Sequence, residues 1–384
     1  MRSVSRRIPF NKPYIGEEEV RAAAEVIRSG KIRGNEGPIG FAVENQLKNL
    51  YGVKHVLLTT SCTHAMELAM MVLGIKQGDE VICPSFTFTS TATCIVLQGA
   101  KPVFTEIEEE TANIDPEDIK RKITEKTKAI MCMHYAGVGC KMDEINKMAG
   151  EHGIYVVEDA AQAIGAKYKG KYLGTVSDVG CLSFHETKNI TCGEGGAFFT
   201  NNDDFFDKAS IISEKGTDRR DFLKRKKKGK YTWVDRGSSF VLSDVLAAIL
   251  GEQLKKIEII TRKRQLIFKH YFDGLKDLED EGKIVLPYVP DYCKPNGHIF
   301  YIRLRTEQER DLLIEKMYKR GIDSVFHYIP LHSSPYAKRQ YGYKEEDLPI
   351  TEKVSATLIR LPIYPDLSFE DQEYVINSIK NALS

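Results

Sequence analysis

This chain of 384 residues has almost no excess of charge of either sign. Lys and Arg number 55 and Asp and Glu 54, so the formal net charge is +1. Proteins that bind nucleic acid through bulk electrostatics carry a clear basic excess. The balance excludes nucleic-acid binding over the whole surface and leaves room for a small anionic ligand in a local site.

Long apolar runs are also missing. No stretch approaches the roughly 20 apolar residues that cross a bilayer. The basic N-terminus, with Arg2, Arg6 and Arg7, runs into Pro9 and Pro13 rather than into the apolar segment of a secretory signal. We therefore expect a soluble, cytoplasmic protein with no membrane partner.

The eight cysteines form no CxxC pair, and no Cys/His pair has the spacing of zinc ligands. A chain of this length needs no disulfide to stabilise its core, so the sequence predicts buried, reduced thiols and no metal site. A G-x-G-x-x-G fingerprint is absent as well, which argues against a nicotinamide-dependent oxidoreductase.

Strand-like and helix-like segments alternate through the first half of the chain. Apolar runs predict strands at 56–59, 80–83, 101–104, 128–133, 155–157 and 179–184, and helices at 65–73 and 142–153. Asp115, followed by Pro116 and Glu117, predicts a helix start with Asp115 as the N-cap. This order predicts an α/β fold with a mainly parallel sheet, in which ligands bind beyond the carboxyl ends of the strands.

The pattern changes after about residue 245. The sequence predicts a long helix over 244–264 that continues or restarts over 265–278, strands at 284–286 and 299–302, and a helix over 307–320. We expect a large domain at 1–249, which includes an N-terminal arm, and a smaller α+β domain at 250–384.

Two residues that follow predicted strands suggest cofactor chemistry. Asp159 comes directly after 155–157, where a carboxylate can pair with a ring nitrogen of a cofactor, although a strand-end Asp also commonly caps the next turn. Lys188 follows 179–184, where a partly desolvated amine can bond to an aldehyde, although an exposed turn lysine is the simpler interpretation. The glycines of 193–196 allow the backbone to pass close to a ligand.

Three further features have both a functional and a plain interpretation. Cys62 and Thr63 offer amides to a phosphate at the start of a predicted helix, or belong to an ordinary helix cap. Phe88 either stacks on a planar ring or belongs to the core. The basic run at 224–230 is either a solvated loop or a loop that meets a phosphate-bearing substrate.

The combination of these features is more specific than any one of them. A phosphate cup, a stacking aromatic, a strand-end Asp and a loop Lys occur in that order at the predicted strand ends. An enzyme that uses pyridoxal 5'-phosphate (PLP) on the aspartate-aminotransferase fold, fold type I, requires this arrangement.

Longer strings resemble the DegT-type sugar aminotransferase family nearly from end to end. They lie at 60–63, 78–81, 157–162, 183–189, 193–196 and 361–365. Those that are most similar to members aminating C4 of TDP-4-oxo-6-deoxyglucose lie at 134–138, 185–189, 237–239 and 326–332. The resemblance implies PLP as the cofactor and a homodimer whose two active sites are shared between the chains.

The resemblance also implies a role for each matching residue. Lys188 would bond covalently to PLP and move protons, and Asp159 would pair with the ring nitrogen. Phe88 would stack on the ring, and Gln162 would lie beside the ring oxygen. The residues implied at the cofactor phosphate are Cys62, Thr63, Ser183 and, from the partner chain, Ser239.

The loop that the partner chain would contribute departs from the family pattern. Ser239 stands where relatives have Asn, and Val241 stands where many have Arg. A contact to the substrate pyrophosphate would then come from Lys230 or the preceding basic run. His327 and His332 either line the substrate pocket or pack in the interior.

Lys188 also separates two reactions. Relatives that remove a sugar hydroxyl carry His at this position, so Lys favours amino transfer. The resemblance implies transfer from L-glutamate to a TDP-4-oxo-6-deoxy sugar with a galacto product, as in lipopolysaccharide and enterobacterial common antigen synthesis. The alternatives are a 3-oxo sugar, a 4-oxo sugar that gives the gluco epimer, and a non-catalytic PLP-binding regulatory protein.

Overall fold

A seven-stranded sheet forms the centre of the chain, of which the computed structural model describes residues 6–34, 38–224 and 230–384. In spatial order its strands are β1 (His55–Thr59), β9 (Gly196–Thr200), β8 (Val179–Ser183), β5 (Tyr155–Asp159), β4 (Thr127–Met133), β2 (Glu80–Pro84) and β3 (Lys101–Thr105). Only β9 of this sheet runs antiparallel to its neighbours. The predicted mainly parallel sheet is confirmed.

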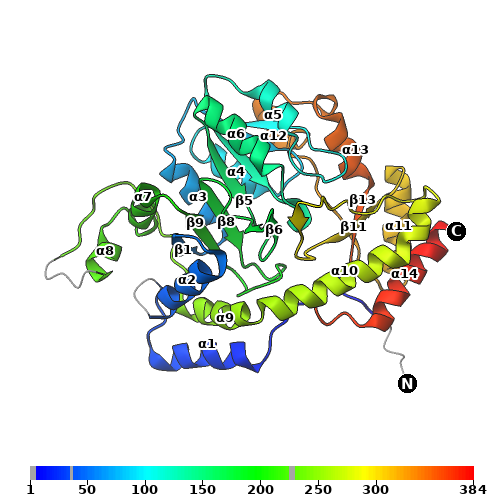
Figure 1. Ribbon diagram of the computed structural model, residues 1–384, viewed down its shortest axis with the longest axis horizontal. Helices are drawn as coiled ribbons and strands as arrows, with labels where there is room; N and C mark the ends of the chain where they lie inside the picture. The colour runs from blue at the N-terminus through cyan, green and yellow to red at the C-terminus, as the bar shows by residue number, and fades with distance from the viewer. Residues whose placement is uncertain (1–5, 35–37, 225–229) are drawn as a thin grey trace.

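Helices cover both faces of this sheet, as Figure 1 shows. One face packs against α3 (Cys62–Val72), α4 (Thr89–Val96) and α7 (Asp203–Ser213). The other packs against α2 (Pro38–Tyr51), α5 (Pro116–Lys122), α6 (Met142–His152) and α9 (Asp244–Lys255). Successive residues of β1 divide between these layers, because side chains alternate along a strand: Leu57 joins the first cluster, and Val56 and Leu58 join the second.

Two helix starts show how the local sequence sets the element bounds. The Asp115 side chain accepts a hydrogen bond from the Glu117 amide, and Pro116 occupies the first turn of α5, as predicted. The helix α3 begins at Cys62 rather than at residue 65, because the Ser61 side chain accepts from the His64 amide. This cap places the first turn of α3 directly after β1.

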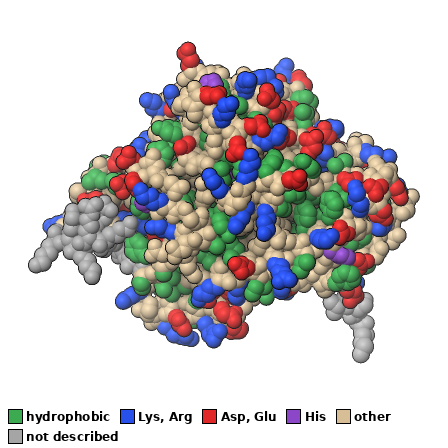
Figure 2. Space-filling model, viewed as in Figure 1, with side chains coloured by type: hydrophobic (Ala, Val, Ile, Leu, Met, Phe, Trp, Pro, Cys, Tyr) green, Lys and Arg blue, Asp and Glu red, His purple; other side chains and the backbone are tan. Residues whose placement is uncertain are grey.

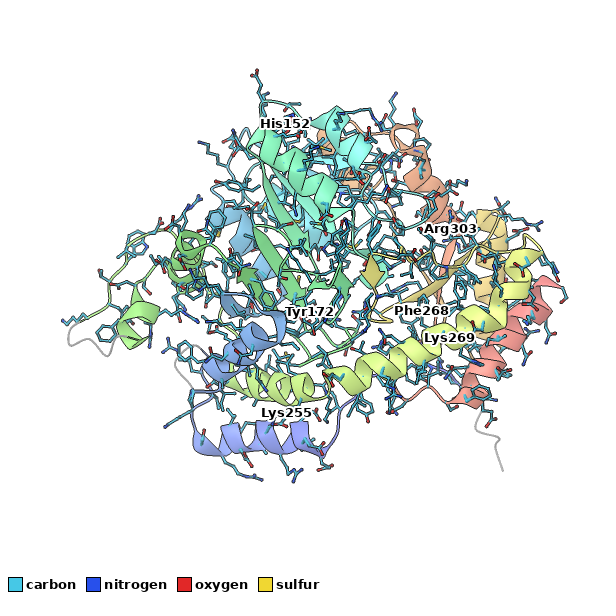
Figure 3. All side chains as sticks on the ribbon, viewed as in Figure 1. His152, Tyr172, Lys255, Phe268, Lys269 and Arg303 are labelled. Atoms are coloured by element: carbon cyan, nitrogen blue, oxygen red, sulfur yellow. The ribbon has the colours of Figure 1, made fainter. Side chains whose placement is uncertain are left out.

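The C-terminal part of the chain contains a second, three-stranded antiparallel sheet. Its strands are β11 (Phe300–Arg303), β13 (Leu358–Leu361) and β12 (Val325–Phe326), in that order. Packed with it are α10 (Ile257–Asp280), α11 (Glu307–Lys319) and α14 (Phe369–Leu383). Phe268 of α10, which Figure 3 labels, lies against Phe300 of β11, with ring centroids 5.0 Å apart. The boundary between residues 249 and 250 stays a prediction.

The remaining elements are short or peripheral. They are α1 (Glu17–Ser29), η1 (Tyr135–Gly137), β6 (Lys167–Tyr168), β7 (Lys171–Tyr172), α8 (Arg219–Lys224), β10 (Cys293–Lys294), α12 (Pro335–Tyr341), η2 (Glu345–Asp347) and α13 (Pro349–Thr357). Figure 1 shows α10 extending from α9, on the side of α1, to α14.

Two element predictions for the C-terminal half are wrong. The helix predicted over 244–264 is interrupted at Lys256, whose Nζ forms an ion pair with Glu19 of α1 at 2.7 Å. The strand predicted over 284–286 is reduced to one bridge between Val285 and Arg303. Pro287 follows two residues later and has no N–H for the next hydrogen bond of a ladder.

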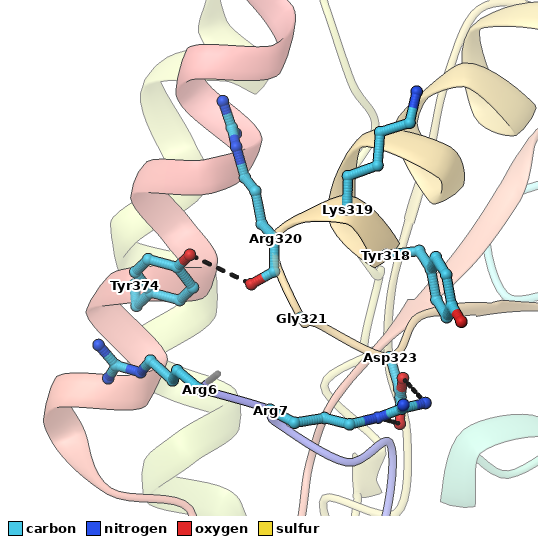
Figure 4. A pocket seen from close by; sticks show the side chains of 8 residues that line it. All are labelled: Arg6, Arg7, Tyr318, Lys319, Arg320, Gly321, Asp323 and Tyr374. Carbon is cyan, nitrogen blue, oxygen red and sulfur yellow. Dashed lines mark hydrogen bonds and ion pairs between the residues drawn. The ribbon is translucent and has the colours of Figure 1, made fainter. Parts of the chain in front are cut away.

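The start of the described chain is fixed on the C-terminal part. The Ile8 amide donates to Gly321 O at 2.8 Å, and Arg7 forms a 3.0 Å ion pair with Asp323 (Figure 4). Gly321 has φ of +74°, and a Cβ there would lie 2.1 Å from Arg6 O. Only glycine fits this close approach. A cavity of about 610 Å³ lies at this junction, and Figure 4 shows the residues that line it.

Charges of both signs are mixed on the surface (Figure 2), and the cysteines are unpaired. On the face that Figure 2 shows, Lys and Arg side chains are interspersed with Asp and Glu. All eight cysteines are free thiols, and only Cys293 is not fully buried. Within the described ranges, no helix has the length and apolar character of a membrane span.

Candidate active site

Asp159 lies buried at the carboxyl end of β5, opposite Met133 of β4 and Cys181 of β8. Its Oδ2 accepts a 2.7 Å hydrogen bond from Thr91 Oγ1, and its Oδ1 accepts one from the Ala161 amide at 3.1 Å. Burial raises the pKa of this carboxyl, against the opposing effect of those two donors. The two contacts hold the carboxylate in one orientation.

Lys188 lies in the loop that joins β8 to the antiparallel strand β9. The ends of this loop are joined by the Phe184 amide, which donates to Gly195 O at 2.8 Å. The lysine side chain is half-buried, and no hydrogen-bond or ion-pair partner of its Nζ exists in the described part of the chain. Loss of solvation lowers the pKa of the amine, and the negative charge of Asp159 opposes this. A lysine with a depressed pKa is a better nucleophile and base at neutral pH.

The first turn of α3 forms a cup for an anion beside these residues. Its leading amides, those of Cys62 and Thr63, have no acceptor within the described structure, and they lie at the positive end of the helix dipole. Gly196 of β9 passes so close that a Cβ would lie 2.5 Å from Cys62 N. Ser183, at the end of β8, pairs directly with Gly196.

Phe88 and Gln162, the two residues predicted to contact the cofactor ring, differ in their exposure to solvent. Phe88 is 59% exposed at the N-terminus of α4, with its ring centroid 6.5 Å from that of Tyr328. Gln162 is buried, and both ends of its amide are occupied: Oε1 accepts from the Ala136 amide at 2.7 Å, and Nε2 donates to Tyr328 Oη at 2.8 Å. Phe88 is free to cover a ligand, and Gln162 is held rigidly.

Sequence patterns assigned no role to several residues that support this site. Thr91 lies in a Ser/Thr-rich segment where nothing distinguishes it from its neighbours. Glu158 is fully buried, and its carboxylate accepts from His134 Nε2 at 3.0 Å and from the Gly174 amide at 2.7 Å. His298 Nδ1 lies 2.9 Å from Oδ1 of Asn189, the residue that follows Lys188 in the chain. These partners are distant in sequence.

The predicted substrate residues are not gathered in one place. His327 is half-buried, with its Nδ1 3.3 Å from Tyr135 Oη, and burial holds the pKa of its ring well below the ordinary value. His332 is fully buried, and its Nδ1 lies 2.7 Å from Ser85 Oγ. That geometry matches the packing interpretation of His332.

Lys230 and Ser239 lie on the surface. Every residue from 230 to 239 is exposed in the single chain, and Ser239 forms a bridge with Glu214. Residues 225–229 of the basic run lie outside the described residues. Within the described ranges, no three His, Cys, Asp or Glu side chains gather as metal ligands do.

Comparisons with known proteins agree over nearly the whole chain. The profile of the DegT/DnrJ/EryC1/StrS aminotransferase family matches residues 13–380. An uncharacterised protein of Methanocaldococcus jannaschii is 38% identical over 382 residues, 98% of each chain. The spore coat polysaccharide biosynthesis protein SpsC of Bacillus subtilis is 31% identical over 380 residues, 97% of this chain and 96% of SpsC.

The fold is also similar to that of a solved sugar aminotransferase in its PLP form. The PLP form of Spr1654 from Streptococcus pneumoniae superposes with a TM-score of 0.90 at 27% identity, covering 98% of this chain and 99% of that one. The sheet, the C-terminal α+β part and their connection are therefore those of a PLP aminotransferase fold, as predicted.

The residues present fit PLP, which is the cofactor of this chain. Amides at a helix N-terminus suit its phosphate, and the missing Cβ of Gly196 lets the backbone of Ser61 and Cys62 lie directly against β9. A buried carboxylate, Asp159, suits a protonated ring nitrogen. An amine without a partner, Lys188 Nζ, suits its aldehyde. The residues of this site therefore suit the phosphate, the ring nitrogen and the aldehyde of the cofactor.

Proposed function

This chain belongs to the DegT/DnrJ/EryC1/StrS aminotransferase family, whose chemistry makes it a PLP-dependent sugar aminotransferase, and from that membership we propose its substrates. It transfers the amino group of L-glutamate to C4 of TDP-4-oxo-6-deoxy-D-glucose. The products are TDP-4-amino-4,6-dideoxy-D-galactose and 2-oxoglutarate.

The main support for amino transfer is that the amine of Lys188 is half-buried and has no partner among the described residues. Its pKa is lowered by loss of solvation, which makes the neutral, basic form of the amine easier to reach than in an exposed lysine. A histidine at this place would serve removal of a hydroxyl. A lysine can in addition release and recapture the cofactor between two half-reactions, which is what exchange of an amine between two substrates needs.

We assign the proton transfers to Lys188. PLP supplies, when bound, an electron sink for the charge that develops on the substrate carbon. Lys188 Nζ removes the proton from Cα of glutamate in the first half-reaction and delivers a proton to C4 of the sugar in the second. The face from which Nζ delivers that proton sets the galacto configuration.

Other residues hold the cofactor without moving protons. Asp159 would accept a hydrogen bond from the ring N–H, and Phe88 would cover one ring face. Gln162 would lie on the side of the ring oxygen. The amides of Cys62 and Thr63, with Ser183, would bind the phosphate.

A second copy of the chain completes the site. Residues 230–239 expose large apolar side chains, including Trp233 at 77% and Tyr231 at 43%. Such a surface is typical of an interface. A homodimer brings Ser239 to the cofactor phosphate of the partner chain and Lys230 to the pyrophosphate of the sugar nucleotide. His327, beside Tyr135, lines the sugar pocket.

The choice of sugar is supported by sequence strings and by one relative. The residues at 134–138 and 326–332 resemble those of 4-amino-4,6-dideoxygalactose synthesis, and they flank the site through Tyr135 and His327. The name of SpsC connects a similar protein with a polysaccharide. The product would serve as a precursor of a cell-surface polysaccharide such as lipopolysaccharide or enterobacterial common antigen.

The test follows the visible absorbance of PLP bound to the purified protein. We expect the band to fall with L-glutamate and to return with TDP-4-oxo-6-deoxyglucose, and NMR of the product to show a galacto amine at C4. A response to glutamate, with return only on a 3-oxo sugar or with a gluco product, would replace the substrate and keep the reaction class. A band that responds to no amino donor would leave a PLP-binding protein without transferase activity.

A further inference from the structure

His298 is a buried histidine that connects the C-terminal part of the chain to the loop of Lys188. It lies two residues before β11, and its Nδ1 is 2.9 Å from Oδ1 of Asn189, which directly follows Lys188. Asn189 is buried as well, and the two residues are 109 positions apart in the chain. The contact therefore fastens the turn after Lys188 to a remote segment.

The surroundings of this contact show which atom carries the proton. Asn189 Nδ2 donates to the carbonyl oxygen of Asn296 at 3.0 Å. Because a backbone carbonyl oxygen only accepts, the amide nitrogen of Asn189 must face Asn296 and its oxygen must face His298. His298 Nδ1 is therefore protonated and donates to Asn189. Nε2, the other ring nitrogen, has no hydrogen-bond partner in the part of the chain that the structure describes.

The ring of His298 is neutral as well as fixed in its tautomer. Burial, with the positive charges of Lys188 and Arg264 adding to its effect, holds the pKa of this ring well below the ordinary value of histidine. A neutral imidazole that is protonated on Nδ1 has a lone pair on Nε2. His298 therefore contributes one N–H group and no positive charge beside the lysine.

The segment that carries His298 is itself held at several points. The Asn296 side chain donates to the carbonyl oxygens of Gln162 and Ile164, both at 2.9 Å, and accepts from the His298 amide at 3.1 Å. Arg264 of α10 donates to the carbonyl oxygen of His298 at 3.0 Å. The N–H group that meets Asn189 thus comes from a support tied to both parts of the chain.

The amine of Lys188 needs such a support because it has no contact of its own. Its Nζ has no hydrogen-bond or ion-pair partner among the described residues, and a lysine has a flexible stem of four carbons. The place of Nζ is therefore set by the backbone on either side. Before the side chain, the Lys188 amide donates to His185 O at 2.9 Å. After it, the Asn189 side chain provides the attachment to residues 296–298.

We propose that His298 is a positioning residue for Lys188, an inference that rests on the proposed function. By holding Asn189, it keeps the lysine amine where it can reach the cofactor aldehyde and then the substrate carbon. A displacement of about 1 Å is enough to slow such a step strongly. The effect is exerted through Nδ1 and Asn189, so Nε2 takes no part in it.

The experiment uses variants that keep the place of one ring nitrogen at a time. His298→Asn keeps an N–H group near the Nδ1 position and lacks Nε2, whereas His298→Gln reaches the Nε2 position and lacks Nδ1. The apoprotein is mixed with PLP in a stopped-flow spectrometer, and the rise of the visible band gives the rate at which Lys188 bonds to the aldehyde. We expect His298→Gln and His298→Leu to slow this capture about 30-fold and His298→Asn to stay within about threefold of wild type. His152→Leu, on the exposed surface of α6, is the control.

Two further measurements separate positioning from general damage. Pyridoxamine phosphate forms no bond to Lys188, so its dissociation constant, measured by fluorescence, should change less than about twofold in every His298 variant. The double variant His298→Leu with Asn189→Ala should capture PLP no more slowly than the slower single variant, because the two residues act through one contact. If the leucine variant does not fold, the Asn and Gln variants decide the matter.

The pattern among the variants gives the answer. Slow capture in His298→Asn with normal capture in His298→Gln would assign the effect to Nε2 and overturn the inference. Equal slowing in every variant, no slowing in any, or a parallel loss of pyridoxamine phosphate binding would also overturn it. These readouts involve no sugar. A wild-type protein that captures PLP in this His298-dependent way but transfers no amine to any sugar would remove the proposed function and leave the role of His298 standing.

Discussion

Thr91 and Asp159 are joined by a 2.7 Å hydrogen bond, in which the threonine Oγ1 donates to Oδ2 of the carboxylate. The contact joins the first turn of α4 to the end of β5. Because a carboxylate buried without donors would be protonated more readily, the threonine favours the ionised form of Asp159. That form is the one that a protonated cofactor ring requires.

Replacing Thr91 with Val should weaken PLP binding by about tenfold, because one hydrogen bond to a charged group is lost while the shape is kept. The dissociation constant is measured by titrating the apoprotein with PLP. Thr91→Ser keeps the hydroxyl and should stay close to wild type. Equal weakening in both variants would mean that packing of the threonine methyl, rather than the hydrogen bond, is what matters.

Replacing Lys188 with Ala should lower turnover at least about 10³-fold, because the variant lacks the group that moves the proton. The fold should survive, since Nζ has no partner in the described residues and its removal breaks no contact. Thermal unfolding and steady-state turnover are measured together, with the exposed Lys171→Ala as the control. Near-normal turnover of the alanine variant would remove Lys188 from the mechanism.

Replacing Asp159 with Asn should stabilise the apoprotein at neutral pH. Burial raises the pKa of Asp159 above its ordinary value. The folded wild type therefore holds this proton more tightly than the unfolded chain, an advantage that is complete below pH ~4 and is lost as the pH rises through the folded pKa. An asparagine side chain is neutral at every pH, so the variant does not lose stability in this way as the pH rises.

Urea unfolding of the two apoproteins at pH 4 and pH 7 checks this sign. The free energy of unfolding of the asparagine variant, relative to wild type, should rise by on the order of 1 kcal/mol from pH 4 to pH 7. It should also lose amino transfer, because an amide cannot balance a protonated ring. A stability difference that is the same at both pH values would show that the folded and unfolded chains bind this proton equally, which would contradict the raised pKa.

Replacing Gly196 with Ala should damage the phosphate cup. The added Cβ would lie 2.4 Å from the carbonyl carbon of Ser61, which is backbone and cannot turn aside. We expect a loss of about 1–3 kcal/mol in unfolding free energy and much weaker PLP binding. Gly150→Ala, on α6 with nothing within 4 Å of its Cβ, is the matched control and should be neutral or stabilising. Unchanged PLP affinity in the Gly196 variant would place the phosphate elsewhere.

Local patterns in the sequence were enough for the framework of this protein. Short apolar runs predicted six strands of the large sheet, because strands buried on both faces read as continuous apolar runs. The seventh strand, β9, was not predicted. The Asp115 and Pro116 pair gave a helix start because both act on their own first turn. The rule that ligands meet strand ends then singled out Asp159 and Lys188.

Local sequence patterns could not predict side-chain contacts between segments that are far apart in the chain. Thr91 and Asp159 are 68 residues apart, and Ser85 and His332 are 247 apart. The break of the long helix at Lys256 accompanies an ion pair with Glu19, again from a remote element. Nothing in the residues near these positions distinguishes them.

The sequence by itself determined the order of strands and helices, and with it the family and the cofactor chemistry. Only the tertiary structure decided which polar side chains are paired. It enclosed His332 against Ser85, and it joined the ring of His298 to Asn189. The physical reason is that propensity and patterning act over a few residues, whereas burial and pairing of charge depend on segments that only the folded chain brings together.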